Sequence, residues 1–300
     1  MEKTRSDQHD VPGKMVTNAA KKIYARKPIG LHGSIPIFSE SNEYTDNYER
    51  ISDDHLSSLH GDETNPFIPE DVWVQMENAT IALVRKYSSP GNMILDVGVG
   101  LGRLLSHFPE LQRYGIDISF GYLRSAQKKG IEVCYSLVED VPYRKETFDI
   151  VVCTDVLEHV IDINLSIRRI LSVLKTDGLL IVRTPYREDL SWYVSDKNPY
   201  KYVHLRTFDE NSLRLLFERT ASCEVVETQF STYLPYPERL KYSIPFPKGG
   251  VILYRLIKGI RSVFSSAIDG LVRKMYYPVE IDVVVRKLKH DYLASEDVQT

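Results

Sequence analysis

Residues 94–102 read Ile94-Leu95-Asp96-Val97-Gly98-Val99-Gly100-Leu101-Gly102. An apolar strand predicted over 93–97 therefore runs directly into three glycines, and a helix is predicted over 103–108. Glycines permit the sharp turn and the close approach of the backbone to a ligand that such a loop requires. The free amides at the start of the next helix can bind a negatively charged group. The pattern predicts a strand–loop–helix unit that binds a nucleotide-like cofactor.

The spacing of the glycines separates two classes of cofactor. The loop has the pattern G-x-G-x-G and is followed by Arg103, so the dinucleotide pattern G-x-G-x-x-G is absent. Asp96 lies two residues before the first glycine, where a carboxylate could orient the loop or hold an ammonium group but would repel a pyrophosphate. The loop therefore argues against a nucleotide-cofactor oxidoreductase, which is the alternative class of enzyme.

Predicted strands and helices alternate around this loop. Strands are expected at 114–118, 131–136, 148–154, 179–184, 223–233 and 280–288, and helices at 69–87, 122–129, 165–174 and 209–221. Nearly continuous apolar strands that alternate with helices are typical of a parallel sheet that is buried on both faces. We expect an α/β fold, with a Rossmann-like, doubly wound, mostly parallel seven-stranded sheet and helices on both faces.

A second carboxylate follows the second predicted strand. Asp117 lies at the C-terminal end of 114–118, in the sequence Tyr114-Gly115-Ile116-Asp117-Ile118-Ser119. Ligands of such sheets bind outside the carboxyl ends of the strands. Because a carboxylate there can accept both hydroxyls of a ribose, Asp117 predicts a nucleoside without specifying which one.

Composition narrows the possible classes further. The chain has 300 residues and a net charge of −3, which does not indicate binding of nucleic acid through bulk charge. Its cysteines, Cys134, Cys153 and Cys223, are far apart and form no CxxC pair, so we expect neither a disulfide framework nor a metal site. Residues 1–27 contain no apolar signal segment, and a cytoplasmic location is expected.

Taken in order, these motifs resemble those of the class I S-adenosylmethionine-dependent methyltransferases, in particular the group with the ubiquinone-type and sugar O-methyltransferases. The glycine loop and the acidic second strand are followed by VEDVPY (138–143), TFDIVVC (147–153), DVLEHV (155–160), LKTDGLLIV (174–182) and VHLRTF (203–208). The resemblance covers about residues 70–233 and the last strand. Seven motifs in the same order are far more specific than any one of them.

The resemblance implies S-adenosyl-L-methionine as cofactor and S-adenosyl-L-homocysteine as product. The residues implied in cofactor binding are Asp96, Gly98, Gly100, Gly102, Asp117, Ile118, Val138, Glu139 and Thr154. The glycines would line the methionine part, Asp117 would hold the ribose, 137–139 would flank the adenine, and Thr154 would lie near the sulfonium. Many relatives have Asp where Leu137 stands here. Either backbone atoms and Glu139 replace that carboxylate, or adenine contact is weaker.

The expected reaction is transfer of a methyl group to a small-molecule acceptor, most readily a hydroxyl of a sugar, a secondary metabolite or a lipid-linked phenol. An alcohol acceptor is helped by a general base, and imidazole suits that role near neutral pH. His159 and His204 both follow strands at the ligand-binding edge and are the candidate catalytic residues. A structural role in the loop is the alternative for both, and a non-catalytic cofactor-binding protein is the alternative for the chain.

Two segments flank or interrupt the predicted domain. Residues 1–68 are expected to be an N-terminal extension, partly flexible, that covers the cofactor through Tyr44 and Tyr48. Residues 69–300 are expected to form the methyltransferase domain, with an insertion at 233–278. Its helix at 251–275 is amphipathic and basic, which favours packing as a lid or homodimer surface over peripheral contact with an anionic membrane.

Overall fold

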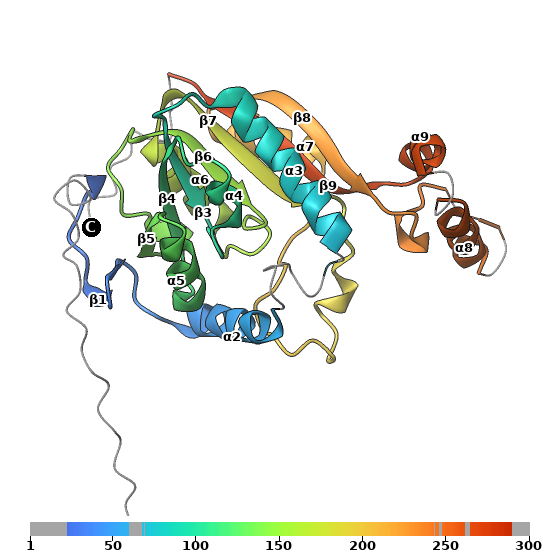
Figure 1. Ribbon diagram of the computed structural model, residues 1–300, viewed down its shortest axis with the longest axis horizontal. Helices are drawn as coiled ribbons and strands as arrows, with labels where there is room; N and C mark the ends of the chain where they lie inside the picture. The colour runs from blue at the N-terminus through green and yellow to red at the C-terminus, as the bar shows by residue number, and fades with distance from the viewer. Residues whose placement is uncertain are drawn as a thin grey trace, which may run out of the picture.

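A computed structural model describes residues 23–59, 68, 70–242, 244–245, 248–261 and 265–289. The flexible start predicted for the N-terminal extension lies outside these residues. Figure 1 shows an α/β protein in which helices pack on both faces of one twisted sheet.

The sheet has the order β1-β2-β5-β4-β3-β6-β7-β9-β8. Its strands are β1 (Gly30–His32), β2 (Ile35–Ile37), β3 (Met93–Val97), β4 (Gln112–Asp117), β5 (Glu132–Tyr135), β6 (Phe148–Thr154), β7 (Leu174–Pro185), β8 (Cys223–Tyr233) and β9 (Pro278–Lys287). Strands β5, β4, β3, β6 and β7 are parallel to their neighbours, whereas β9 is antiparallel to both β7 and β8. The predicted doubly wound, mostly parallel fold is confirmed.

Two strands extend the predicted sheet of seven to nine. β1 and β2, of three residues each, form a hairpin with Gly33 in its turn. β2 joins β5 through the single parallel pair Ile37 and Tyr135. Strands this short have no periodicity from which a sequence could predict them. The N-terminal extension therefore contributes to the sheet as well as to the surface.

Alternation along the strands divides the core between the two faces. Leu95 and Val97 of β3 belong to the apolar cluster that includes side chains of α6 (Ile163–Val173) and α7 (Glu210–Thr220). Ile94 belongs to the cluster that includes side chains of α3 (Glu70–Tyr87), α4 (Arg103–Ser106) and α5 (Phe120–Lys128). The helices expected near 69–87, 165–174 and 209–221 are thus present and bury the faces that their apolar spacing predicts.

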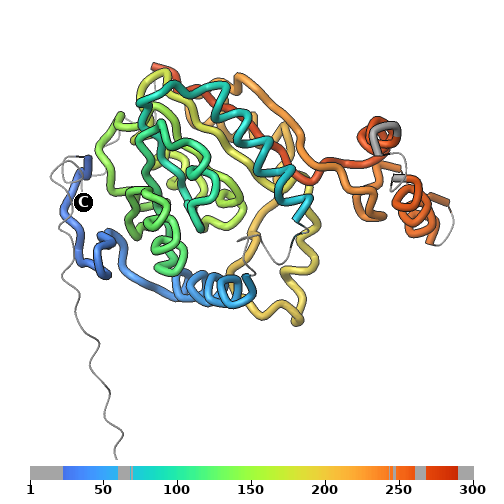
Figure 2. The backbone as a smooth tube through the Cα atoms, viewed as in Figure 1, coloured from blue at the N-terminus to red at the C-terminus, as the bar shows by residue number. Residues whose placement is uncertain are grey.

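The N-terminal extension contains a longer helix than its sequence suggests. α2 spans Glu43–Ser58, where a short helix around Tyr44–Arg50 is the most that local sequence indicates. Asn42 caps it, because its side chain accepts from the amides of Tyr44 and Thr45 and the Thr45 hydroxyl pairs with the Asn42 amide. Figure 2 shows this helix passing below the sheet, away from the first strands.

The expected single helix at 251–275 is two helices, α8 (Gly249–Arg261) and α9 (Ser265–Met275). They pack through a small core of Ile257, Ile268, Val272 and Tyr276 and stand off from the sheet (Figure 1). The packing of α8 against α9 buries one face of α8, while Ile252 and Leu256 of the same helix stay exposed. Contact with a second copy or with a membrane remains a prediction for that face. Among the described helices, none has the length and apolarity needed to span a membrane.

The core of the α6–α7 face supports a direct test of stability. Phe217 of α7 is fully buried, so Phe217→Ala should lower the free energy of unfolding by about 3–5 kcal/mol. Leu215 on the same helix is 59% exposed, and Leu215→Ala should change that free energy by less than about 0.5 kcal/mol. Urea denaturation measures both, and equal losses would contradict the assignment of the buried face.

Candidate functional site

The carboxyl ends of β3, β4, β6 and β7 lie at one edge of the sheet, because these strands are parallel. Helix α2 is held at this edge by two contacts to the start of α5. The Ser52 and Ser119 hydroxyls are 2.7 Å apart, and Glu49 accepts from the Phe120 amide at 3.1 Å. The N-terminal extension therefore reaches the edge where the sequence predicts the cofactor.

The three glycines of the loop after β3 have different surroundings. All three have positive φ angles, which favour glycine. A side chain at Gly98 would collide with Val156, and one at Gly102 would come within 2.8 Å of the Cα atom of Ala126 in α5. On the corresponding side of Gly100, no described atom lies within 4 Å. Gly98 and Gly102 thus permit close packing, and Gly100 faces open space beside the loop.

Asp117 fixes the loop to the neighbouring strand. Its Oδ2 accepts from the Gly100 amide at 2.9 Å, and its Oδ1 accepts from the amides of Ile118 and Ser119 at 2.8 and 2.9 Å. Burial raises the pKa of Asp117 to about 6, while these three backbone donors act in the opposite direction. The carboxylate is therefore held in place and still has lone pairs for ligand hydroxyls.

Asp96 is the second buried carboxylate at this edge. It is 2% exposed, and among the described residues its Oδ1 has no hydrogen-bond partner. Burial, and then the nearby charge of Asp117, raises the pKa of Asp96 well above its usual value, although Arg183 opposes the shift. A cationic group that reached Asp96 would relieve the desolvation of this carboxylate.

A pocket of about 390 Å³ opens beside the loop after β5. It is lined by Asn42, Glu43, Tyr44, Leu137, Glu139, Ile161, Asp162 and Tyr202. Of the predicted cofactor residues only Glu139 lines it, next to Leu137. Val138 packs against the core instead. Thr154 ends β6, outside this lining.

The first described residues hold the loop after β5 in place. Arg26 pairs with Asp140 at 2.6 Å, and Ser39 donates to the same carboxylate at 3.0 Å. Ser39 also accepts from the Leu137 amide at 3.0 Å. Hydrogen bonds and an ion pair therefore connect the extension to the predicted adenine-binding segment 137–139 and to Asp140 beside it.

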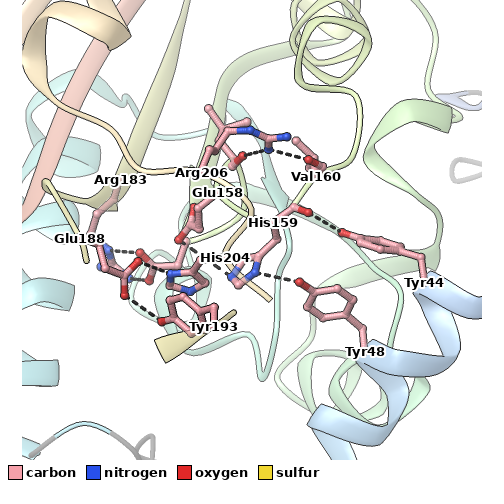
Figure 3. A network of polar contacts seen from close by, with 12 residues as sticks. Tyr44, Tyr48, Glu158, His159, Val160, Arg183, Glu188, Tyr193, His204 and Arg206 are labelled. Carbon is pink, nitrogen blue, oxygen red and sulfur yellow. Dashed lines mark hydrogen bonds and ion pairs between the residues drawn. The ribbon is translucent and has the colours of Figure 1, made fainter. Parts of the chain in front are cut away.

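The two candidate catalytic histidines lie together (Figure 3). Their ring centroids are 4.5 Å apart, with the ring planes nearly perpendicular. His159 Nδ1 lies 2.8 Å from the Tyr48 hydroxyl, and His204 Nδ1 is hydrogen-bonded to Glu188. Tyr193 donates to the other oxygen of Glu188 at 2.8 Å. Burial, and then the neighbouring His204, lower the pKa of His159 to about 3.

Backbone contacts bring the two histidines to one place. Arg206 donates to the carbonyls of Leu157 and Val160 at 2.7 and 2.5 Å, and the Leu205 amide donates to the carbonyl of Glu158 at 2.8 Å. The loop after β7 is thereby fastened to the loop after β6. Loops expose backbone carbonyls, and the guanidinium satisfies several of them at once.

Glu158 belongs to the same cluster and is not among the residues predicted from the sequence. It is 1% exposed, and its Oε1 lies 4.0 Å from His159 Nε2. Ligand atoms of Glu158, His159 and His204 lie within 4.8 Å of one another, so these side chains could hold a metal ion. Glu188 was also missed, because it lies in a loop without periodicity. For Glu158, the adjoining His159 was the available signal.

Arg183 of β7 organises the remaining acidic groups. It is 4% exposed and forms a bidentate ion pair with Asp155. Its Nη2 lies 2.5 Å from Oδ2 of Asp155, and its Nε lies 3.2 Å from Oδ1. It also donates to Thr80, which donates to Asp282 at 3.0 Å. Asp155 has a φ of 55°, a left-handed conformation that is unusual for a residue with a side chain. The ion pair holds it there.

Two solved structures share this fold. One is a chain of the complex between the Haloferax volcanii Trm112 methyltransferase activator and a methyltransferase, with a TM-score of 0.56, 14% identity, and coverage of 83% of this chain and 99% of that one. The other is a SAM-dependent methyltransferase from Thermotoga maritima, with a TM-score of 0.52, 19% identity, and coverage of 82% and 100%. At these identities the likeness concerns the fold.

Residues 95–182 match a family model described as a methyltransferase domain. This part of the chain is therefore similar to known methyltransferase domains. The resemblance stated from the sequence motifs is thus confirmed. A ubiquinone biosynthesis O-methyltransferase from Bradyrhizobium diazoefficiens is 34% identical over 102 residues, which are 31% of this chain and 40% of that protein. The chain thus spans less than two thirds of this relative's length.

The buried acids next to this candidate site predict a dependence of stability on pH. Burial raises the pKa of Asp282 to about 6, above its unfolded value, so its protonated form favours the folded state. That contribution is fully present at low pH and is lost as the pH rises through about 6. Asp282→Asn should reduce the loss of stability between pH 5 and pH 8 by about 1 kcal/mol. Urea denaturation at both pH values measures this, and an unchanged difference would refute the assignment.

Proposed function

We propose that this chain transfers a methyl group from S-adenosyl-L-methionine to a hydroxyl of a small-molecule acceptor. The observation that carries the proposal is the placement at one sheet edge of the glycine loop, Asp96, Asp117 and the paired histidines His159 and His204. The first three suit a cationic nucleoside. The histidines suit the acceptor, because they lie on the loops after β6 and β7.

The side chains at the edge fit the cofactor. Asp117 is placed to accept the ribose hydroxyls, and Gly100 leaves room along the loop. The unpartnered oxygen of Asp96 suits the positive charge of the methionine part, whereas it would repel the pyrophosphate of NAD. The pocket beside Leu137 and Glu139 suits the adenine. The bound cofactor would supply an activated methyl group on a sulfonium.

The protein's remaining task is to position and activate the acceptor oxygen. His204 is oriented by Glu188, as a histidine that handles protons or ligands commonly is. Tyr48 and Tyr193 form aromatic walls on either side of the two histidines. Such walls suit a sugar face or a phenol ring. The relative named as a ubiquinone biosynthesis O-methyltransferase supports a hydroxyl acceptor.

The extension and the insertion have proposed roles in the same reaction. Tyr44 lines the pocket and Tyr48 contacts His159, so α2 would cover the cofactor and part of the acceptor. Asn47 binds the loop after β7 through the backbone of Lys201 and Tyr202, at 2.7 to 3.2 Å. Release of α2 would open both sites together.

Cofactor binding can be tested by thermal shift. S-adenosylhomocysteine should raise the melting temperature and NAD should not, because only a ligand that binds the folded state stabilises it. Asp117→Ala should weaken S-adenosylhomocysteine binding by about 10-fold or more, since hydrogen bonds to a charged group are lost. Asp71→Ala, at an exposed position of α3, is the matched control. Stabilisation by NAD instead would overturn the proposed cofactor.

The acceptor class can be tested by the release of S-adenosylhomocysteine from the full chain. Phenols, sugars and lipid-linked phenols should turn over, and amine analogues of the same acceptors should not. The reason is that His204, which Glu188 orients, is suited to assist loss of a hydroxyl proton. Turnover of the amines alone would contradict a hydroxyl acceptor while leaving the cofactor assignment intact.

A further inference from the structure

We propose that Glu158, His159 and His204 form a binding site for a divalent transition-metal ion. Each offers one ligand atom, and these atoms lie within 4.8 Å of one another. The three residues come from two loops, after β6 and after β7, which Arg206 and the amide of Leu205 hold together. Two imidazoles and one carboxylate leave coordination positions open for an exogenous ligand.

Both imidazoles are held as ligands require. A metal-binding histidine commonly donates its second ring nitrogen to a carboxylate or another oxygen. His204 Nδ1 is bonded to Glu188, which also accepts from Tyr193, so the proton lies on Nδ1 and the lone pair on Nε2. His159 Nδ1 faces the Tyr48 hydroxyl at 2.8 Å. His204 Nε2 is thus left for the metal, and His159 Nε2 lies 4.0 Å from Glu158 Oε1.

The hydroxyls around His159 are compatible with this tautomer. Tyr44 packs beside Tyr48, with ring centroids 4.8 Å apart, and the Tyr44 hydroxyl donates to the His159 carbonyl at 3.5 Å. The Tyr48 hydroxyl can accept the Nδ1 proton of His159, because a hydroxyl oxygen has lone pairs.

Glu158 supplies a second, independent reason. It is 1% exposed, and within the described part of the chain neither carboxylate oxygen has a hydrogen-bond partner. A buried carboxylate without partners is strongly unfavourable. A histidine general base oriented by Glu188 would need no such group beside it. A cation at the histidines would give Glu158 the partner that it lacks.

The charge around the cluster favours a cation as well. The charges that act on Glu158 include the carboxylates Asp155 and Glu188 and the guanidinium groups of Arg183 and Arg206. Arg183 is already paired with Asp155, and Arg206 is hydrogen-bonded to the carbonyls of Leu157 and Val160. The local excess of negative charge is thus left for another positive group to balance.

The donor set favours zinc, iron(II) or cobalt over magnesium and calcium, because imidazole suits the former and oxygen ligands the latter. Ligands at about 2.1 Å from a tetrahedral metal lie roughly 3.4 Å apart. Binding would therefore draw Glu158 toward His159, from the 4.0 Å that now separates their nearest atoms. Side chains on loops can make that movement.

The metal would also define the acceptor, and this part rests on the proposed function. An acceptor hydroxyl on an open coordination position loses its proton to solvent more readily, as metal-bound water does. The resulting oxygen attacks the methyl carbon, the C–O bond forms as the S–C bond breaks, and a methyl ether and S-adenosylhomocysteine result. Acceptors with two adjacent hydroxyls could occupy two open positions and should be preferred.

The site can be tested without turnover, by titrating Co²⁺ and Zn²⁺ into the chelator-treated full chain. Calorimetry should show one ion per chain, and Co²⁺ should give visible absorption bands. His204→Ala and Glu158→Gln should weaken binding at least 100-fold, and Glu188→Gln about 10- to 100-fold, as loss of such an outer partner does. His107→Ala, at an exposed histidine, should leave binding unchanged.

Several outcomes would overturn the metal site. The proposal fails if the wild-type chain binds neither Co²⁺ nor Zn²⁺, or if His204→Ala binds the metal with the same affinity as the wild type. If Glu158→Gln fails to fold, Glu188→Gln and His204→Ala still decide the question. S-adenosylhomocysteine binding by thermal shift is measured on the same samples. Cofactor binding without metal binding would refute only the metal site and would return His204 to the general-base role.

Discussion

Three backbone amides converge on the carboxylate of Asp117, and the organisation of the edge where we propose that the cofactor binds depends on this contact. It fastens the glycine loop after β3 to the end of β4 through Gly100, and it fixes the turn into α5 through Ser119. Ser119 in turn contacts Ser52 of α2. Hydrogen bonds to an ionised acceptor are stronger than neutral ones, so one carboxylate can hold three segments. The parallel pairing of β3 and β4 places the glycine loop beside the end of β4, and the hydrogen bonds of Asp117 join the two.

The acceptor side is assembled from segments that are distant in the sequence. Tyr48 and His159 are 111 residues apart, yet they form one hydrogen bond. Arg206 and Asn47 each donate hydrogen bonds to backbone carbonyls of a loop that has no regular secondary structure, and so hold that loop in place. The result is an arrangement in which the rings of His159 and His204 lie against each other.

Buried acids link the cofactor edge to the acceptor side. Burial raises the pKa values of Asp96, Glu158 and Glu280 well above normal. Arg183 is the positive charge that acts on all three carboxyls, but it is already paired with Asp155. The three carboxyls therefore lack a full counter-charge. A surplus of buried carboxyls is unfavourable in isolation and becomes favourable with cationic occupants. A sulfonium cofactor near Asp96 and a metal ion near Glu158 would both meet this need.

The sequence by itself determined the fold class, the glycine loop and the place of Asp117. These follow from local rules: apolar periodicity, glycines where the backbone turns sharply, and the carboxyl ends of parallel strands. Strand 223–233 was predicted with the bounds that β8 has. Both histidines were placed at the ligand edge, although each was considered alone.

Only the tertiary structure decided what surrounds them. The pairing of His159 with His204, the partners Glu188 and Tyr48, and the buried Glu158 depend on contacts between loops. The strands β1 and β2 and the division of 251–275 into two helices likewise depend on packing. Loops carry no periodicity, and their course is set by which distant groups satisfy their hydrogen bonds. Those partners become adjacent only when the chain has folded.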